Sequence, residues 1–122
     1  MSRTILVIED NAQNLYLMRF LLEREGYLVI AAVDGPSGID MAREQRPDGI
    51  VLDIQLPRID GYAVAVTLRA DPDFKLTPII VVTSYVMPGD REKAMAHGAT
   101  DYLEKPINST RFVERVRQHV PV

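Results

Sequence analysis

Three short, uninterrupted apolar runs stand out along the chain, at residues 5–8, 50–52 and 79–82. They are rich in β-branched residues and do not alternate with polar side chains. Such runs are typical of strands that are covered on both faces of a parallel sheet. Residues 28–32 and 102–104 show a weaker form of the same signal. The pattern therefore predicts five strands.

Helical periodicity fills the segments between these runs. Leu15, Met18 and Leu22 recur at helical spacing ahead of Gly26, and glycine is favoured just after a helix. A second helix is predicted between Pro36 and Pro47. The remaining helices are predicted at residues 62–69, at residues 88–97, and at a last segment that is capped by Asn108 or Ser109 and buries Phe112, Val113, Val116 and Val120.

The elements therefore alternate, strand then helix, five times along the chain. This alternation predicts an α/β fold in which a parallel sheet carries helices on both faces. A length of 122 residues is typical of one domain. A content of 47% hydrophobic and 25% charged residues is globular.

Charge and composition exclude several classes of function. The net charge of −3 gives no basic surface of the kind that binds nucleic acid or an anionic membrane. The absence of cysteine excludes disulfides, thiolate catalysis and zinc-thiolate sites. No apolar run approaches the roughly 20 residues of a membrane span, and no signal peptide is visible. These features fit a cytoplasmic location.

Chemically active side chains follow four of the five predicted strands. Glu9 and Asp10 follow the first, Asp53 the third, Thr83 the fourth and Lys105 the fifth. In open α/β sheets, ligands bind outside the carboxyl ends of the strands, so these groups are expected to share one pocket. Three neighbouring carboxylates repel one another, and a divalent cation relieves that repulsion. Oxygen ligands without Cys or His favour Mg²⁺ over zinc.

The same groups suit a phosphorylated carboxylate. The metal and the Lys105 ammonium would neutralise a dianionic group, and the Thr83 hydroxyl would donate a hydrogen bond. Each residue taken alone has a simpler interpretation: Asp53 and Thr83 as turn formers, Glu9 and Asp10 as capping residues of the first helix, and Lys105 as a solvated charge. Only their combination at the strand ends favours a functional site.

The chain resembles the receiver domains of response regulators in two-component signalling. The matching motifs are Val-Ile-Glu-Asp-Asn at 7–11, Leu-Asp-Ile-Gln-Leu-Pro at 52–57 with Asp-Gly at 60–61, Val-Thr-Ser at 82–84, and Lys-Pro at 105–106. The resemblance covers residues 4–119. It implies a flavodoxin-like, doubly wound parallel sheet of five strands in the order 2-1-3-4-5, with five helices.

The resemblance also implies roles for the residues of the pocket. Asp53 would be the phosphoacceptor and Asp10 a direct ligand of Mg²⁺. Glu9 would act through a metal-bound water, and the backbone carbonyl of Gln55 would complete the protein ligands. The phosphoryl group would come from a histidine kinase or a histidine phosphotransfer protein.

The resemblance also implies residues that contact the phosphoryl group or respond to it. Thr83 and Lys105 would contact its oxygens, and the Lys105–Pro106 bond is expected to be cis. The family often has Ala where this chain has Ser84. Tyr102 lies at the position of the family's switch aromatic. Together with Thr83 it would alter the face formed by the fourth helix, fifth strand and fifth helix, where a downstream protein would bind.

Three alternatives bear on these expectations. The motifs resemble both stand-alone DivK-like receivers and the receivers of hybrid histidine kinases, and the first is favoured: one receiver domain over residues 1–122 with no output domain. An aspartate-nucleophile phosphatase is disfavoured, because it needs an acid where Gln55 stands. A phosphorylation-independent interaction module is disfavoured by the intact pocket. The chain is thus expected to assist only its own phosphorylation and dephosphorylation, with Tyr85 shielding the phosphoryl group from water.

Overall fold

A single parallel sheet forms the centre of the molecule. The computed structural model describes residues 2–84 and 87–122. Within these ranges the sheet has five strands in the order β2-β1-β3-β4-β5, as the resemblance implied. The strands are β1 (Thr4–Ile8), β2 (Leu28–Ala32), β3 (Gly49–Asp53), β4 (Ile79–Thr83) and β5 (Asp101–Glu104).

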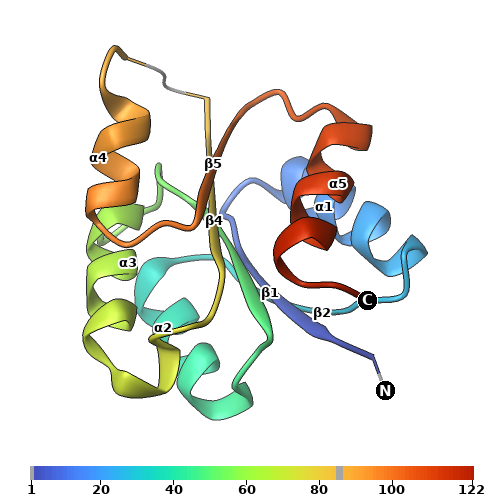
Figure 1. Cartoon of the computed structure of the whole chain (residues 1–122), viewed down its shortest axis with the longest axis horizontal. Helices are drawn as coiled ribbons and strands as arrows, with labels where there is room; N and C mark the ends of the chain where they lie inside the picture. The colour runs from blue at the N-terminus through green and yellow to red at the C-terminus, as the bar shows by residue number, and fades with distance from the viewer. Residues whose placement is uncertain (1, 85–86) are drawn as a thin grey trace.

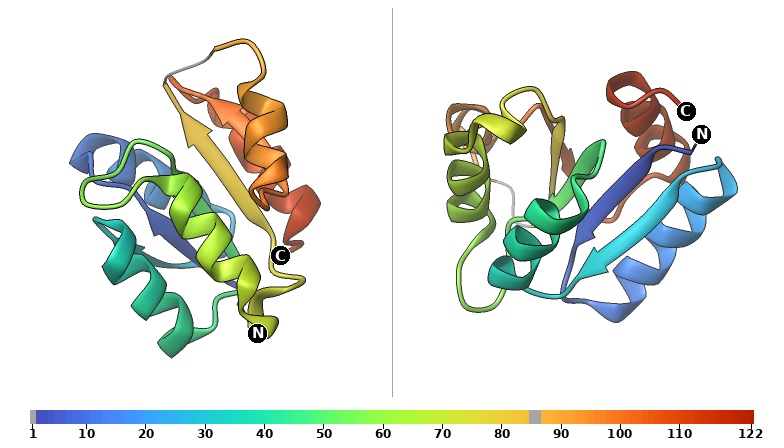
Figure 2. Two further views of the ribbon diagram at one scale, coloured as in Figure 1. Left: turned by 90° about the vertical axis from the view of Figure 1, so that its left-hand side faces the viewer. Right: turned by 90° about the horizontal axis from the view of Figure 1, so that it is seen from below.

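Helices cover both faces of this sheet. Figures 1 and 2 show α2, α3 and α4 on one face and α1 and α5 on the other. The helices are α1 (Ala12–Arg24), α2 (Gly35–Gln45), α3 (Gly61–Ala70), α4 (Asp90–Ala96) and α5 (Ser109–His119). The architecture is therefore the expected flavodoxin-like, doubly wound fold.

The sheet divides the core into two apolar clusters. Neighbouring strand residues point to opposite faces, so Leu6 and Ile8 pack towards α2, α3 and α4, while Ile5 and Val7 pack towards α1 and α5. Every residue of the two central strands β3 and β4 is buried. This two-sided burial explains why the apolar runs in the sequence do not alternate with polar residues.

Side-chain caps begin four of the helices. Asn11, Asp34, Asp60 and Asn108 each accept a hydrogen bond from the main-chain N–H three residues further on. Such caps satisfy N–H groups that have no partner within the helix. The structure thus selects Asn108 over Ser109 as the cap of α5.

Two local features differ from the predictions. Helix α4 spans Asp90–Ala96, shorter than the predicted 88–97, because Gly89 has a left-handed φ of 87° that a helix cannot contain. A 3₁₀ helix, η1 (Pro72–Phe74), follows α3 in a segment where the sequence analysis predicted no helix. It places Phe74 in the core, where the ring is 2% exposed. Among the described residues, no helix is long and apolar enough to cross a membrane.

A glycine at the start of α3 brings this helix against the end of β3. A Cβ atom added to Gly61 would lie 2.5 Å from the carbonyl oxygen of Asp53 and 2.6 Å from Cα of Ile54. Both are backbone atoms, which cannot rotate away. The Gly61 N–H also donates to the Ile54 carbonyl at 2.9 Å. Only glycine fits here, and it sets the position of the loop after Asp53.

We expect Gly61→Ala to lower the free energy of unfolding by roughly 1–3 kcal/mol, because the added methyl group overpacks a backbone contact. Urea unfolding followed by circular dichroism measures this loss. Gly38→Ala is the matched control, since its methyl group would meet the side chain of Ile8 instead of backbone. An equal or smaller loss for Gly61→Ala would contradict the steric interpretation.

Candidate functional site

The acidic residues predicted from the sequence meet at the carboxyl edge of the sheet. β1 lies beside β3, so the segment after β1 carries Glu9 and Asp10 next to Asp53, the last residue of β3. One carboxylate oxygen from each of the three residues lies within 4.8 Å of the other two. The topology thus forces three like charges into one pocket.

The three carboxylates differ in their exposure. Glu9 is 0% exposed and Asp53 is 2% exposed, while Asp10 faces solvent. Buried charges are costly unless they are paired and hydrogen-bonded. The two buried carboxylates therefore need compensating groups from the protein.

Lys105 supplies the compensating charge. Its Nζ atom lies 2.6 Å from Oε1 of Glu9 and 3.2 Å from Oδ2 of Asp53. The side chain is only 11% exposed, so the ion pairs are weakly screened by water. The Lys105–Pro106 peptide bond is cis, as the resemblance implied. One ammonium group thus bridges both buried carboxylates.

Main-chain N–H groups bind the remaining oxygens of these carboxylates. The N–H of Gln55 donates to Oδ1 of Asp53 at 3.0 Å, and the N–H of Asn11 donates to Oε2 of Glu9 at 3.2 Å. Asp53 is thereby held at both oxygens, by Lys105 on one side and by Gln55 on the other. Its orientation is fixed before any ligand arrives.

The crowding of the pocket perturbs one acid strongly. The pKa of Glu9 is raised to about 7, chiefly by burial and in addition by nearby Asp53, while the Lys105 ammonium and the Asn11 N–H act in the opposite direction. A carboxylate that is half protonated near neutral pH signals a deficit of positive charge. A cation bound beside Glu9 and Asp53 would remove this deficit.

The donor set fits Mg²⁺. Mg²⁺ takes oxygen ligands at about 2.0–2.1 Å in an octahedron, so adjacent ligands lie about 3 Å apart and opposite ligands about 4.2 Å apart. The three carboxylate oxygens lie within 4.8 Å of one another, which is close enough to surround one ion. A contraction of the pocket, or a water in place of one direct ligand, would complete the octahedral geometry. The solvent-facing Asp10 provides the route of entry.

The other predicted residues lie around this pocket. Thr83 is 2% exposed at the last position of β4, and its carbonyl accepts from the Lys105 N–H at 2.8 Å. Gln55 takes part through its main chain, and its side chain is exposed. Tyr102 packs instead in the cluster under α2, α3 and α4. Tyr85 falls outside the described residues.

Two polar contacts were missed by the sequence reasoning. The hydroxyl of Ser84 donates to Oε1 of Gln55 at 2.8 Å, next to the pocket. Asp101 is a buried carboxylate that binds Arg115 and His119 of α5. Only the spacing of Arg115 and His119 on one helical face could have indicated a shared partner.

Comparison with known proteins agrees with this geometry. Residues 5–117 match the family model of the response regulator receiver domain. The chain is 38% identical over 120 residues to the polar-differentiation response regulator DivK of Brucella anthropi, which covers 98% of both chains.

Solved structures show the same fold. A putative response regulator from Chloroflexus aurantiacus superposes with a TM-score of 0.94 at 28% identity, over 100% of both chains. The receiver domain of a sensor histidine kinase from Pseudomonas aeruginosa superposes with a TM-score of 0.90 at 32% identity, also over 100% of both chains. That structure holds a magnesium ion coordinated in its active-site cleft.

Lys105 occupies the space between the carboxylates as a built-in cation, so it competes with a bound metal. We expect Lys105→Met to tighten Mg²⁺ binding by roughly 5-fold, equivalent to about 1 kcal/mol for one nearby unit charge. Isothermal titration calorimetry at pH 8, where Glu9 is largely ionised, measures this. Lys75→Met, at an exposed site after η1, is the control. Weaker binding in Lys105→Met would show that Lys105 supports the metal site.

Proposed function

The chain belongs to the response regulator receiver domain family of two-component signalling, and on that basis we propose that it accepts a phosphoryl group on Asp53 with Mg²⁺ bound beside it. The observation that carries this proposal is the carboxylate of Asp53. It is almost fully buried, held at both oxygens, and flanked by two further carboxylates within reach of one metal ion. Such a carboxylate is an oriented nucleophile.

The proposed reaction transfers a phosphoryl group from a phosphohistidine. A carboxylate oxygen of Asp53 forms a bond to phosphorus while the bond between phosphorus and the imidazole nitrogen breaks, and the imidazole leaves. Bound Mg²⁺ would supply positive charge beside the phosphoryl oxygens. Lys105, already 3.2 Å from Oδ2 of Asp53, would neutralise a further oxygen, and Thr83 would donate a hydrogen bond. The same groups would assist hydrolysis of phospho-Asp53.

The positions of the acidic residues support the metal ligands that the family resemblance implies. Asp10, which faces solvent, and Asp53 would bind the ion directly. Glu9, which is fully buried and already bound by Lys105 and Asn11, would act through a water. The main-chain carbonyl of Gln55 would complete the protein ligands, in the loop whose N–H already binds Asp53.

The proposed partners are of two kinds. A histidine kinase or a histidine phosphotransfer protein would donate the phosphoryl group. A downstream protein would bind the face formed by α4, β5 and α5, and no nucleic acid or membrane takes part. The proposal also includes a cytoplasmic location, which rests on family membership alone.

A groove on the proposed downstream face supports this assignment. It has a volume of about 540 Å³ and runs between α4 and α5 over β5. Its lining includes Arg91, Tyr102, Lys105, Arg111 and Phe112. Lys105 lines this groove and also binds Glu9 and Asp53, so one residue borders both the groove and the acidic pocket.

Tyr102 is the proposed switch residue within this face. Its ring is 6% exposed, and its hydroxyl is buried without a hydrogen-bond partner among the described residues. Burial raises the pKa of this hydroxyl. A buried hydroxyl without a hydrogen-bond partner costs roughly 1–3 kcal/mol. This cost reduces the free-energy difference between the inward state of the Tyr102 ring and an outward state in which water binds the hydroxyl. The inward ring is therefore held by packing alone, and a small change in packing would shift it.

We expect Asp53→Ala to abolish phosphorylation while the domain stays folded, because removal of one crowded carboxylate leaves the pair of Lys105 and Glu9 intact. Intact-protein mass spectrometry after incubation with acetyl phosphate and Mg²⁺ measures the added phosphoryl group. Asp40→Asn, on an exposed position of α2, is the control and should be phosphorylated normally. Full phosphorylation of Asp53→Ala would refute the assignment.

We expect a phosphoryl mimic at Asp53 to change the surroundings of Tyr102. Amide chemical shifts should move at the pocket and also along α4 and β5 when trifluoroberyllate and Mg²⁺ are added. Tyr102→Phe removes the unpartnered hydroxyl, so it should raise stability by up to about 1 kcal/mol and reduce the distant shift changes. Tyr16→Phe, on an exposed position of α1, is the control. Shifts confined to the pocket would show that the coupling is absent.

A further inference from the structure

A hydrogen bond between two side chains joins the loops on either side of Asp53. Ser84, directly after β4, donates from its hydroxyl to Oε1 of Gln55 at 2.8 Å. The main-chain pairing of β3 with β4 already extends past Asp53, since the N–H of Ile54 donates to the Val82 carbonyl at 3.2 Å. The bond between Ser84 and Gln55 is the next link outward from the sheet.

This link acts on a residue that itself holds the phosphoacceptor. The N–H of Gln55 donates to Oδ1 of Asp53 at 3.0 Å. A continuous chain of contacts therefore runs from the end of β4, through the side chain and main chain of Gln55, to the carboxylate of Asp53. A shift of the Gln55 loop would move the N–H group away from Oδ1.

The rest of the loop is held from the other side. The N–H of Gly61 donates to the Ile54 carbonyl at 2.9 Å, and Nε of Arg58 lies 3.8 Å from Oδ2 of Asp34 at the start of α2. These contacts tie the loop towards α2 and α3. The Ser84 hydroxyl ties the loop towards β4, the strand that ends in Thr83.

We propose that Ser84 is a positioning residue, which holds the Gln55 loop in the geometry that binds Mg²⁺ and orients Asp53. The proposal deepens the function assigned above and rests on it for the role of the metal. Because Ser84 directly follows Thr83 in the chain, any movement of Thr83 towards a phosphoryl group carries Ser84 with it. The bond thus connects the strand that senses the phosphoryl group to the loop that binds the metal.

The exposure of Ser84 and Gln55 to solvent limits how much the loss of their hydrogen bond can change Mg²⁺ affinity. Both side chains are exposed, so water replaces part of the lost bond when either partner is removed. We therefore expect changes of a few fold, and not a loss of binding. An alanine at this position is common in the family, so the Ser84→Ala variant should fold.

A double-mutant cycle on Mg²⁺ affinity tests the proposal. We expect Ser84→Ala and Gln55→Met each to weaken Mg²⁺ binding by about 3-fold, and the double variant to bind no more weakly than Gln55→Met alone. Isothermal titration calorimetry gives the four affinities. Ser109→Ala, an exposed serine at the start of α5, is the matched control and should leave the affinity unchanged. Normal affinity in Ser84→Ala, or additive losses, would overturn the proposal.

A second measurement in the metal-free protein separates this proposal from the proposed function. The amide proton of Gln55 reports its hydrogen bond to Asp53, so its chemical shift should change in Ser84→Ala and not in Ser109→Ala. If the wild-type protein neither binds Mg²⁺ nor accepts a phosphoryl group, the proposed function fails, and the Gln55 signal still decides the role of Ser84. An unchanged Gln55 signal would overturn the positioning role even if Asp53 is phosphorylated.

Discussion

The mutual repulsion of three carboxylates is the constraint on which the rest of the site depends. The topology of the sheet brings Glu9, Asp10 and Asp53 together, and burial of two of them multiplies the cost of their charge. Lys105 offsets part of that cost, yet the pKa of Glu9 remains near 7 because burial outweighs the ion pair. The pocket is therefore built for more positive charge than the chain itself provides. A metal ion would enter a site whose carboxylates are already oriented and whose positive charge is incomplete.

The scaffold makes this arrangement possible because two neighbouring inner strands are buried on both faces. Strands β3 and β4 are fixed by packing on both sides up to their last residues, Asp53 and Thr83. Gly61 brings the start of α3 within backbone contact of Asp53, where any side chain would collide. The reactive groups thus stand on rigid elements. The movable parts are the loops beyond them, and preorganisation of this kind is what phosphoryl transfer requires.

The sequence predicted those parts of the molecule that depend on local composition and on strand order. Unbroken apolar runs indicated the buried strands, and the residues after them indicated the pocket, because strand ends share one edge whatever the side chains do. The predicted start of α4 at residue 88 was wrong, because the actual start depends on the left-handed φ of Gly89, which the composition does not reveal. The bond between Ser84 and Gln55 and the cluster around Asp101 join residues that are distant in sequence. From the sequence alone, each of these side chains could equally have been a solvated polar group. Such pairings depend on tertiary packing, which periodicity cannot supply.

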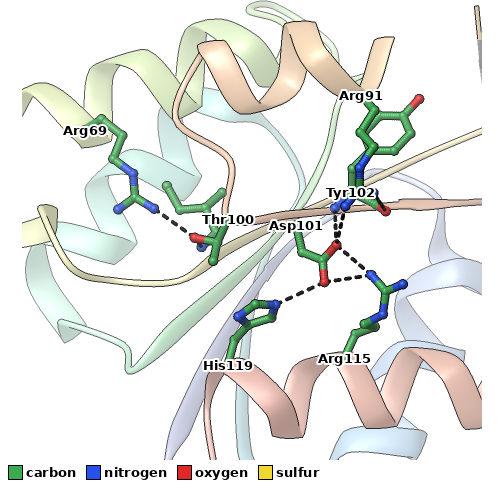
Figure 3. Close-up of polar contacts among 8 residues, drawn as sticks. Arg69, Arg91, Thr100, Asp101, Tyr102, Arg115 and His119 are labelled. Atoms are coloured by element: carbon green, nitrogen blue, oxygen red, sulfur yellow. Dashed lines mark hydrogen bonds and ion pairs between the residues drawn. The ribbon is translucent and has the colours of Figure 1, made fainter. Parts of the chain in front are cut away.

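The edge strand β5 carries an anchor, Asp101, next to the proposed switch residue, Tyr102. On one face Asp101 binds Arg115 at 2.7 Å and His119 at 3.0 Å (Figure 3). Burial raises the pKa of Asp101, but these partners and the Tyr102 N–H outweigh it and hold that pKa below its usual value. The carboxylate therefore stays charged and clamps β5 to α5.

On the other face, Tyr102 makes no such bond through its hydroxyl within the described residues. Arg91 of α4 contacts both residues: it donates to the Tyr102 carbonyl at 3.4 Å and lies 3.8 Å from Oδ1 of Asp101. The far end of α4 is fixed, since Nε of Arg69 donates to the Gly98 carbonyl at 2.8 Å. In the proposed switch, a change at Thr83 and Lys105 would therefore act on the ring of Tyr102, whose hydroxyl has no hydrogen-bond partner among the described residues.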